Sequence, residues 1–330
     1  MRTLLFTISL FILAVFNTPA ISFAQAGVFD SNDFSLKVNP EYPVAFESVS
    51  MSVSSYLFDV NTSQISWVVD GKVAKSGIGL TTHSIFAKNI GQSTLVTVKI
   101  FADGATLTKS VAIKPTSVDV FFESASGYTP PFYKGRALPT KDSQIKIVAL
   151  PILESNATSI NPSGFSYNWK KGESALQGSS GYNKNSLTYF ADYLNTVENI
   201  ELSVSNPLTG YSAKKKMTIP LFEPKILIYE NHPLRGIRFE RSLNNSINIG
   251  SGEKTLLVEP YFINAIGPTS SYLNYTWKIN DQTIPTPNRK NQLVVRNGGQ
   301  VGTSKISLEI ENITKLFEKV STSLLITLTK

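Results

Sequence analysis

The chain contains three tryptophans, Trp67, Trp169 and Trp277, which lie 102 and 108 residues apart in a sequence of 330 residues. Each tryptophan follows an apolar or aromatic residue and a polar residue, and a turn signal comes after it. These strings span residues 65–71, 167–172 and 275–281. Each string is typical of a strand with one buried face that runs into a hairpin. The near-equal spacing therefore predicts three repeats of about 100 residues, and each tryptophan is expected between the two sheets of its repeat.

A strand with strict alternation of apolar and polar residues follows each tryptophan. The apolar positions are Val96, Val98 and Ile100, then Ile200, Leu202 and Val204, then Ile306, Leu308 and Ile310. Alternation of period two, with frequent turn signals, predicts an all-β fold of three tandem immunoglobulin-like β-sandwich domains. One stretch, residues 312–320, has apolar residues at helical spacing and predicts a short connecting helix.

The N-terminal residues have the pattern of an export signal. A basic Arg2 precedes an apolar run at residues 4–16, and the small residues Ala24 and Ala26 end the segment. This order predicts a signal peptide at residues 1–26, and the apolar run is shorter than a membrane-spanning helix. Retention of the segment as an anchor stays the alternative. After cleavage, no transmembrane helix is expected.

Prolines divide the rest of the chain. Pro115 and Pro224 interrupt strands, so we expect β-sandwich domains at residues 27–115, 116–222 and 223–330. Such short junctions predict a semi-rigid rod. The second and third repeats share an elaborated first half: residues 118–123 match 225–230, and residues 151–153 match 260–262.

The tryptophan strings resemble those of immunoglobulin-like and PKD-like β-sandwich modules of bacterial secreted or surface proteins. The string Ser66-Trp67-Val68-Val69-Asp70-Gly71 carries the resemblance most strongly. The acidic, glycine-rich signature that often follows this tryptophan in PKD repeats is missing, and no disulfide can flank it, so the subfamily stays open. The resemblance implies a secreted or cell-envelope protein of repeated modules.

The composition excludes several kinds of chemistry. The chain has no cysteine, which excludes disulfides, thiolate-bound metals and cysteine nucleophiles. Its two histidines, His83 and His232, stand in no metal-binding or catalytic motif, and phosphate-binding glycine loops and calcium loops are missing. We therefore expect no cofactor, no metal site, no catalytic residue and no enzymatic activity.

Positive charge increases along the chain. The net charges of the three predicted domains are 0, +2 and +4. A cationic third domain favours an acidic partner, such as a cell-wall polymer, a polysaccharide or another surface protein. Nucleic acid is disfavoured, because no nucleic-acid-binding motif accompanies the charge.

Two segments of the second and third repeats combine aromatic rings, prolines and cations. Residues 127–136 and 231–241 have the composition of a surface that stacks on sugar rings or binds acidic polymers. The candidate binding residues are Tyr128, Phe132, Tyr133, Lys134, Arg136, His232, Arg235, Arg238 and Phe239. The alternative is structural: a kinked first strand whose aromatic rings cover the end of the sandwich and whose arginines pair with Glu230 or Glu240.

Together these features predict a non-enzymatic structural or adhesive interaction protein of the cell surface or envelope. The alternative function is that of a carbohydrate-binding or cell-wall-polymer-binding module. Binding of a cell-wall polymer or glycan distinguishes the two.

Overall fold

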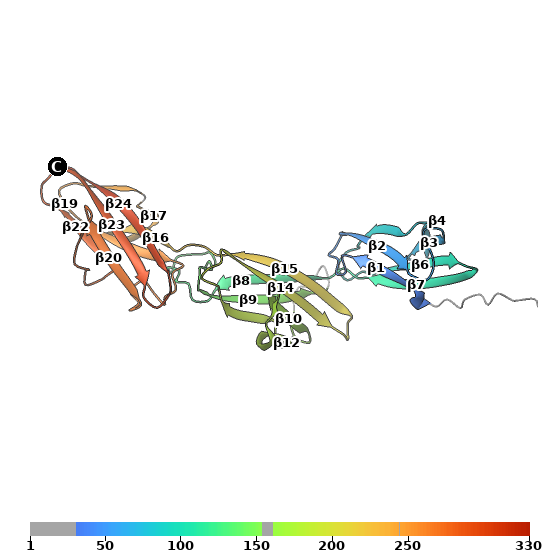
Figure 1. The fold of residues 1–330 in the computed structure, drawn as a ribbon. Coiled ribbons are helices and arrows are strands. Elements are labelled where there is room, and N and C mark those ends of the chain that lie inside the picture. The colour runs from blue at the N-terminus through green and yellow to red at the C-terminus, as the bar shows by residue number, and fades with distance from the viewer. Residues whose placement is uncertain (1–30, 154–160, 244) are drawn as a thin grey trace, which may run out of the picture. The chain divides into compact units, whose positions relative to one another are not determined.

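The structure is a computed structural model that describes residues 31–153, 161–243 and 245–330 (Figure 1). The predicted signal peptide at residues 1–26 lies outside these ranges. Six β-sheets form three β-sandwiches, which confirms the predicted all-β class. Within the described ranges the helical elements are two single turns of 3-10 helix, Ser31–Asp33 and Gln177–Ser179. No helix of the described residues is long and apolar enough to cross a membrane.

The first sandwich packs a three-stranded sheet on a four-stranded one. The first sheet has the order β1 (Phe34–Asn39), β2 (Ser48–Ser55), β5 (Thr82–Phe86). The second has the order β4 (Lys72–Ile78), β3 (Gln64–Val69), β6 (Thr94–Ala102), β7 (Ala105–Ile113). The hairpins β3–β4 and β6–β7 turn at Asp-Gly pairs in which both residues have positive φ, as tight hairpins require.

The second sandwich repeats this arrangement. One sheet has the order β8 (Ser117–Ser124), β9 (Gln144–Ile152), β13 (Ser186–Phe190). The other has the order β11 (Ser174–Ala175), β10 (Ser166–Lys171), β14 (Val197–Asn206), β15 (Tyr211–Pro220), with β12 (Gly181–Tyr182) also on β10.

The third sandwich has a four-stranded and a five-stranded sheet. One sheet has the order β17 (Gly236–Ser242), β16 (Lys225–His232), β19 (Gly252–Tyr261), β22 (Gln292–Asn297). The other has the order β18 (Ser246–Ile249), β24 (Lys319–Leu328), β23 (Gly302–Asn312), β20 (Leu273–Ile279), β21 (Gln282–Thr283). Strand β18 pairs with β24 in parallel.

The three sandwiches share one strand order, which is that of the immunoglobulin-like fold. In the first two sandwiches, the first two strands and the strand before the long alternating strand form one sheet. In the third sandwich β16, β19 and β22 take these places. In all three, the tryptophan strand pairs with the alternating strand in the other sheet. By contacts, most of the first sandwich forms one compact unit, and the second and third sandwiches belong together to another.

Each tryptophan lies at the centre of its sandwich. Trp67, Trp169 and Trp277 are each 0% exposed. Their strand partners are the middle residues of the alternating strands, Val98, Leu202 and Leu308. Each indole N–H donates to a backbone carbonyl, that of Leu80 at 2.8 Å, Lys184 at 2.9 Å or Lys290 at 3.0 Å. Burial of the ring therefore leaves no unpaired donor, which would otherwise cost free energy.

The structural alignment of the first strands of the second and third repeats differs by one residue from the alignment that the sequence predicts. Val118 pairs with Pro151 on β9, and Ile226 pairs with Pro260 on β19. Val118 therefore corresponds to Ile226, and not to Lys225 as the sequence comparison predicts. A shift of one residue turns every side chain of a strand to the opposite face, so only the strand partners reveal the correct match.

The helix predicted at residues 312–320 is wrong. Residues 313–318 form the turn between β23 and β24, and Glu318 closes it. Asn312 Nδ2 donates to Glu318 Oε2 at 2.7 Å, and the Asn264 backbone N–H and Nδ2 donate to Glu318 Oε1 at 2.9 and 2.6 Å. These side-chain hydrogen bonds replace the backbone ladder that a helix would need.

Candidate binding site

The first singled-out segment contacts the third sandwich at two places: Phe132 meets Phe239 of the other segment, and residues 127–128 meet residues 259–263. Residues 127–128 leave the second sandwich and contact the third. The Tyr128 N–H donates to the Ile263 carbonyl at 2.8 Å, and the Tyr128 carbonyl accepts from the Phe262 N–H at 2.6 Å. The Tyr128 hydroxyl donates to Glu259 Oε2 at 2.8 Å, and its ring packs against the core of the third sandwich. Tyr128 thus ties the two sandwiches together.

Aromatic rings of the first segment contact rings of the third sandwich. Phe132 lies 4.4 Å from Phe239 between ring centroids, and Phe239 lies 5.2 Å from Tyr229. Tyr133 meets Tyr261 and Phe262 edge-on at 5.8 and 5.5 Å. Pairs of this geometry stabilise an interface beyond the area that they bury. These rings contact each other, and Phe132 still exposes 64% of its surface.

A buried polar network lies beneath these rings. Asn264 holds Glu318, and its Oδ1 accepts from Ser126 Oγ of the second sandwich. Asn264 Nδ2 also lies 3.4 Å from Thr140 Oγ1. Beside it, Lys315 Nζ pairs with Asp142 Oδ2 at 3.3 Å. Every one of these side chains has a partner across the junction or within the turn, so the network contributes to the contact between the two sandwiches.

The buried carboxyl of Glu318 makes stability depend on pH. Burial raises the pKa of Glu318, and the hydrogen bonds from Asn264 and Asn312 only partly oppose this. The folded chain therefore keeps a proton at pH values where the unfolded chain, with a pKa of about 4.3, has lost it. Stability contributed by this group is complete below that pH and is lost as pH rises through the folded pKa.

We accordingly expect Glu318→Gln to flatten the pH dependence of the third sandwich. Urea melts followed by the Trp277 indole resonance at pH 4 and pH 7 measure it. The fall in the unfolding free energy between these two pH values is expected to be smaller in the variant than in the natural chain. Burial also raises the pKa of Glu259. This carboxyl is present in both proteins, so its contribution to the pH dependence cancels in the comparison. Parallel curves would contradict the assignment to Glu318.

The remaining candidate residues lie on the surface. His232 Nδ1 accepts from the Leu234 N–H at 3.1 Å, and Arg235 is exposed in the same turn. The Arg136 guanidinium lies 4.1 Å above the Phe122 ring, and Lys134 is exposed. The arginine pairing of the structural alternative is present at Arg238, which contacts both Glu230 and Glu240.

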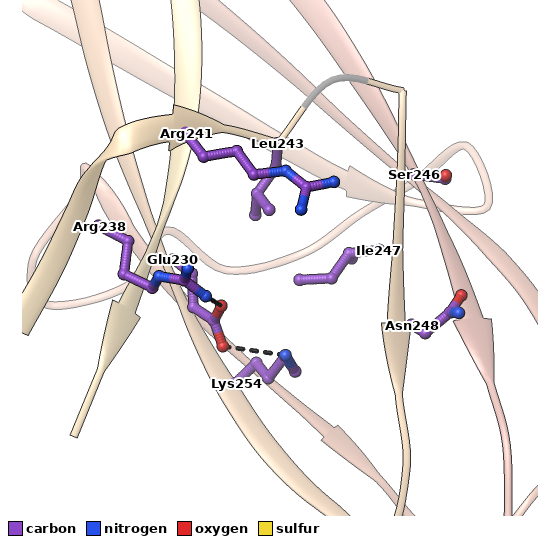
Figure 2. Close-up of a pocket in the computed structure, with 8 residues that line it drawn as sticks. All are labelled: Glu230, Arg238, Arg241, Leu243, Ser246, Ile247, Asn248 and Lys254. Carbon is purple, nitrogen blue, oxygen red and sulfur yellow. Dashed lines mark hydrogen bonds and ion pairs between the residues drawn. The ribbon is translucent and has the colours of Figure 1, made fainter. Parts of the chain in front are cut away.

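A polar pocket of about 380 Å³ opens on the third sandwich next to the β16–β17 hairpin (Figure 2). Three cations line it: Arg238 and Arg241 from β17, and Lys254 from β19. Glu230 of β16 stands between Arg238 and Lys254, and Figure 2 shows the Arg241 guanidinium directed across the opening. The other lining residues are Leu243, Ser246, Ile247 and Asn248.

The charges of the pocket do not balance. Lys254 Nζ lies 2.9 Å from Glu230 Oε1, and Arg238 lies 3.6 Å from Glu230 Oε2. The hydrogen bond from Lys254, together with the charges of Lys254 and Arg238, lowers the pKa of Glu230, so this carboxylate stays ionised. Arg241 makes no ion pair with any described residue. Glu230 and Glu240, which also pairs with Arg238 at 2.8 Å, balance two of the three cations and leave one positive charge, that of Arg241.

This arrangement suits an anionic group. A guanidinium with no ion pair among the described residues presents planar N–H donors that match a carboxylate or phosphate. Sequence reasoning singled out Arg238 but missed Lys254 and Arg241. Lys254 carries no local signal, because only the pairing of β16 with β19 brings it to Glu230.

No protein-family model matches the chain, and no curated protein matches its sequence. Solved structures with several modules are similar. The three N-terminal domains of the Highly Immunogenic Outer Capsid protein (Hoc) of bacteriophage RB49 are 11% identical, with 90% of this chain and 98% of that chain covered and a TM-score of 0.24. The central fibronectin-III array of RIM-binding protein is 12% identical, with 90% and 98% covered and a TM-score of 0.31.

A third similar structure is SGBP-B of the Bacteroides ovatus mixed-linkage glucan utilization locus, solved in complex with a mixed-linkage heptasaccharide. It is 8% identical, with 89% of this chain and 70% of that chain covered and a TM-score of 0.23. These similarities concern the fold alone. The strand order of its own sheets shows that the chain consists of tandem immunoglobulin-like β-sandwich modules.

Proposed function

We propose that this chain is an exported, non-enzymatic interaction protein of the cell surface or envelope. Its repeated sandwiches serve as a structural spacer, and its third sandwich attaches to an acidic polymer. The export pattern at residues 1–26 and the lack of a catalytic motif in the sequence support this. Tandem immunoglobulin-like modules suit such a role, because each folds around its own core and presents its loops and edges to partners.

The cationic pocket is the observation that carries the proposal. Its net positive charge, and a guanidinium with no ion pair among the described residues, fit the carboxylates of an acidic polysaccharide. The exposed ring of Phe132, which contacts Phe239 of β17, adds an apolar surface for a sugar ring. This feature favours an acidic polysaccharide over a neutral one.

Binding to polygalacturonate tests the proposal. We expect residues 27–330 to bind it in affinity electrophoresis, and Arg241→Gln to weaken binding about tenfold, because a charge-assisted hydrogen bond contributes about 1.5 kcal/mol or more. Arg241 has no ion pair with a described residue, so its replacement leaves no carboxylate unpaired.

Arg235→Gln is the matched control. It removes the same charge from the same hairpin but outside the pocket, so binding is expected to change less than about twofold. Binding is also expected to weaken with added salt. Equal binding of dextran and polygalacturonate, or unchanged binding of the Arg241 variant, would refute the assignment of the pocket.

A further inference from the structure

The first strand of the second sandwich, β8, has an open edge. Among the described residues β8 pairs only with β9. The Ala125 N–H donates to the Gln144 carbonyl of β9, whereas the Ser124 N–H points the other way and donates to the Ala137 carbonyl. Backbone groups alternate in direction along a strand. The N–H and carbonyl groups of Val118, Val120 and Phe122 therefore point away from β9, as those of Ser124 do.

These groups have no backbone partner among the described residues, and the edge is occupied only at its end, where the Ala137 carbonyl accepts from Ser124. The register of β8 with β9 runs without a bulge from Ser117 to Ser124, and the strand contains neither lysine nor proline. Natural proteins commonly protect edge strands with such devices. Three successive edge-facing residues thus offer a regular row of donors and acceptors.

The third sandwich covers the same edge with its own chain. The pairing with Pro151 and Pro260 makes Val120 the counterpart of Ile228. The Ile228 carbonyl accepts from the Leu243 N–H at 2.7 Å, and β17 continues this cover along β16. In the second sandwich the corresponding residues, 127–136, instead contact the third sandwich, as Tyr128 and Phe132 show. Only Ala137 returns to β8, at Ser124, so the edge from Val118 to Phe122 has no covering strand among the described residues.

The open edge carries unbalanced charge. A pocket of about 360 Å³ lies along it and is lined by Val120, Phe121, Phe122, Glu123, Arg136, Lys146 and Val148. Arg136 is held over Phe122, and neither Arg136 nor Lys146 makes an ion pair with a described residue. Two cations face one carboxylate there. Phe121 exposes 59% of its surface beside them and offers an apolar contact to a neighbouring strand.

We propose that the edge of β8 binds an extended segment of a partner protein by β-strand addition. The incoming strand pairs with the backbone of Val118, Val120 and Phe122, packs an apolar residue beside Phe121, and directs an acidic side chain to Arg136 and Lys146. Main-chain hydrogen bonds supply affinity in this mode, and side-chain pockets supply specificity. The site is separate from the cationic pocket of the third sandwich and does not depend on it.

Amide hydrogen exchange of residues 27–330, followed by NMR, tests this proposal. Without a ligand, the amides of Val120 and Phe122 are expected to exchange faster than that of Phe121, which bonds to β9. The probe is a nine-residue peptide of alternating valine and threonine with a central glutamate. At saturation it is expected to slow exchange at Val120 and Phe122 about tenfold and to leave Phe121 unchanged.

Two controls separate pairing from other binding. The same peptide with N-methyl groups on alternate residues, placed on the edge that faces β8, cannot donate to the strand and is expected to give no protection. A peptide with glutamine for glutamate is expected to bind several-fold more weakly. Both controls leave the protein unchanged, so a folding defect cannot account for the result.

Three outcomes would overturn the proposal. The edge amides could already be protected in the free chain, which would show that the edge is covered. Protection could rise with protein concentration alone, which would identify a second copy as the occupant. Millimolar peptide could leave all the edge amides unprotected, which would show that the edge does not accept a strand.

Discussion

Replacing Trp169 by alanine is expected to destabilise the second sandwich by about 3 to 5 kcal/mol, because the indole is fully buried and its removal leaves a large cavity. The loss also leaves the Lys184 carbonyl without the indole N–H. A domain of this size has a total stability of roughly 5 to 15 kcal/mol, so the variant is expected to unfold at much lower urea concentration.

The three indole N–H resonances, one in each sandwich, make the measurement specific. In the Trp169→Ala chain, the resonances of Trp67 and Trp277 report on the other two sandwiches, and the amide of Leu202 reports on the second. Tyr182→Ala is the control, since Tyr182 is 67% exposed in the same sandwich and its loss is expected to cost less than about 0.5 kcal/mol. An unchanged midpoint for Leu202 would contradict the central role of Trp169.

Replacing Asn264 by alanine is expected to cost about 3 kcal/mol in the third sandwich, the second-largest effect. Asn264 donates both its backbone N–H and its Nδ2 to the carboxyl of Glu318, which is 6% exposed. The variant removes the side-chain donor and leaves a buried carboxyl with fewer partners. It also removes the acceptor for Ser126 Oγ of the second sandwich.

The loss of the contact with Ser126 distinguishes a residue that joins two sandwiches from one that only supports the core of its own. We expect Asn264→Ala to loosen the contact of residues 126–128 with the third sandwich, so that the amide of Tyr128 exchanges faster even where both sandwiches remain folded. Asn274→Ala is the control, because Asn274 is an exposed asparagine on β20 of the same sandwich. A uniform loss of stability with unchanged exchange at Tyr128 would show that Asn264 supports the turn but does not join the sandwiches.

The repeats could be predicted because their signals are local. A buried tryptophan and an alternating strand 29 to 31 residues later each report on one strand and its two faces. The failed helix at residues 312–320 shows where local signals stop. Its apolar spacing is real, but Ile313, Leu316 and Phe317 are exposed in a turn, and the side chain of Glu318 supplies the bonds that shape it.

The sequence identified the candidate segments by their composition, but it did not predict which residues they contact. Rings and cations at residues 127–136 and 231–241 indicate a surface, but their partners lie on other strands. Phe132 meets Phe239 and Arg238 meets Glu230 only after sheet pairing and the junction bring them together. Lys254 joins the pocket for the same reason, and the sequence around it carries no sign of this.

By itself, the sequence determined the number of sandwiches, their class, the strand that carries each tryptophan and the excess of positive charge in the last repeat. These follow from periodicity and composition, which act within a single strand or domain. Only the tertiary structure decided the register between repeats, the joining of the second and third sandwiches, the cationic pocket and the open edge of β8. Each of these depends on which strands are neighbours, and a shift of one residue in that pairing would turn every side chain to the other face.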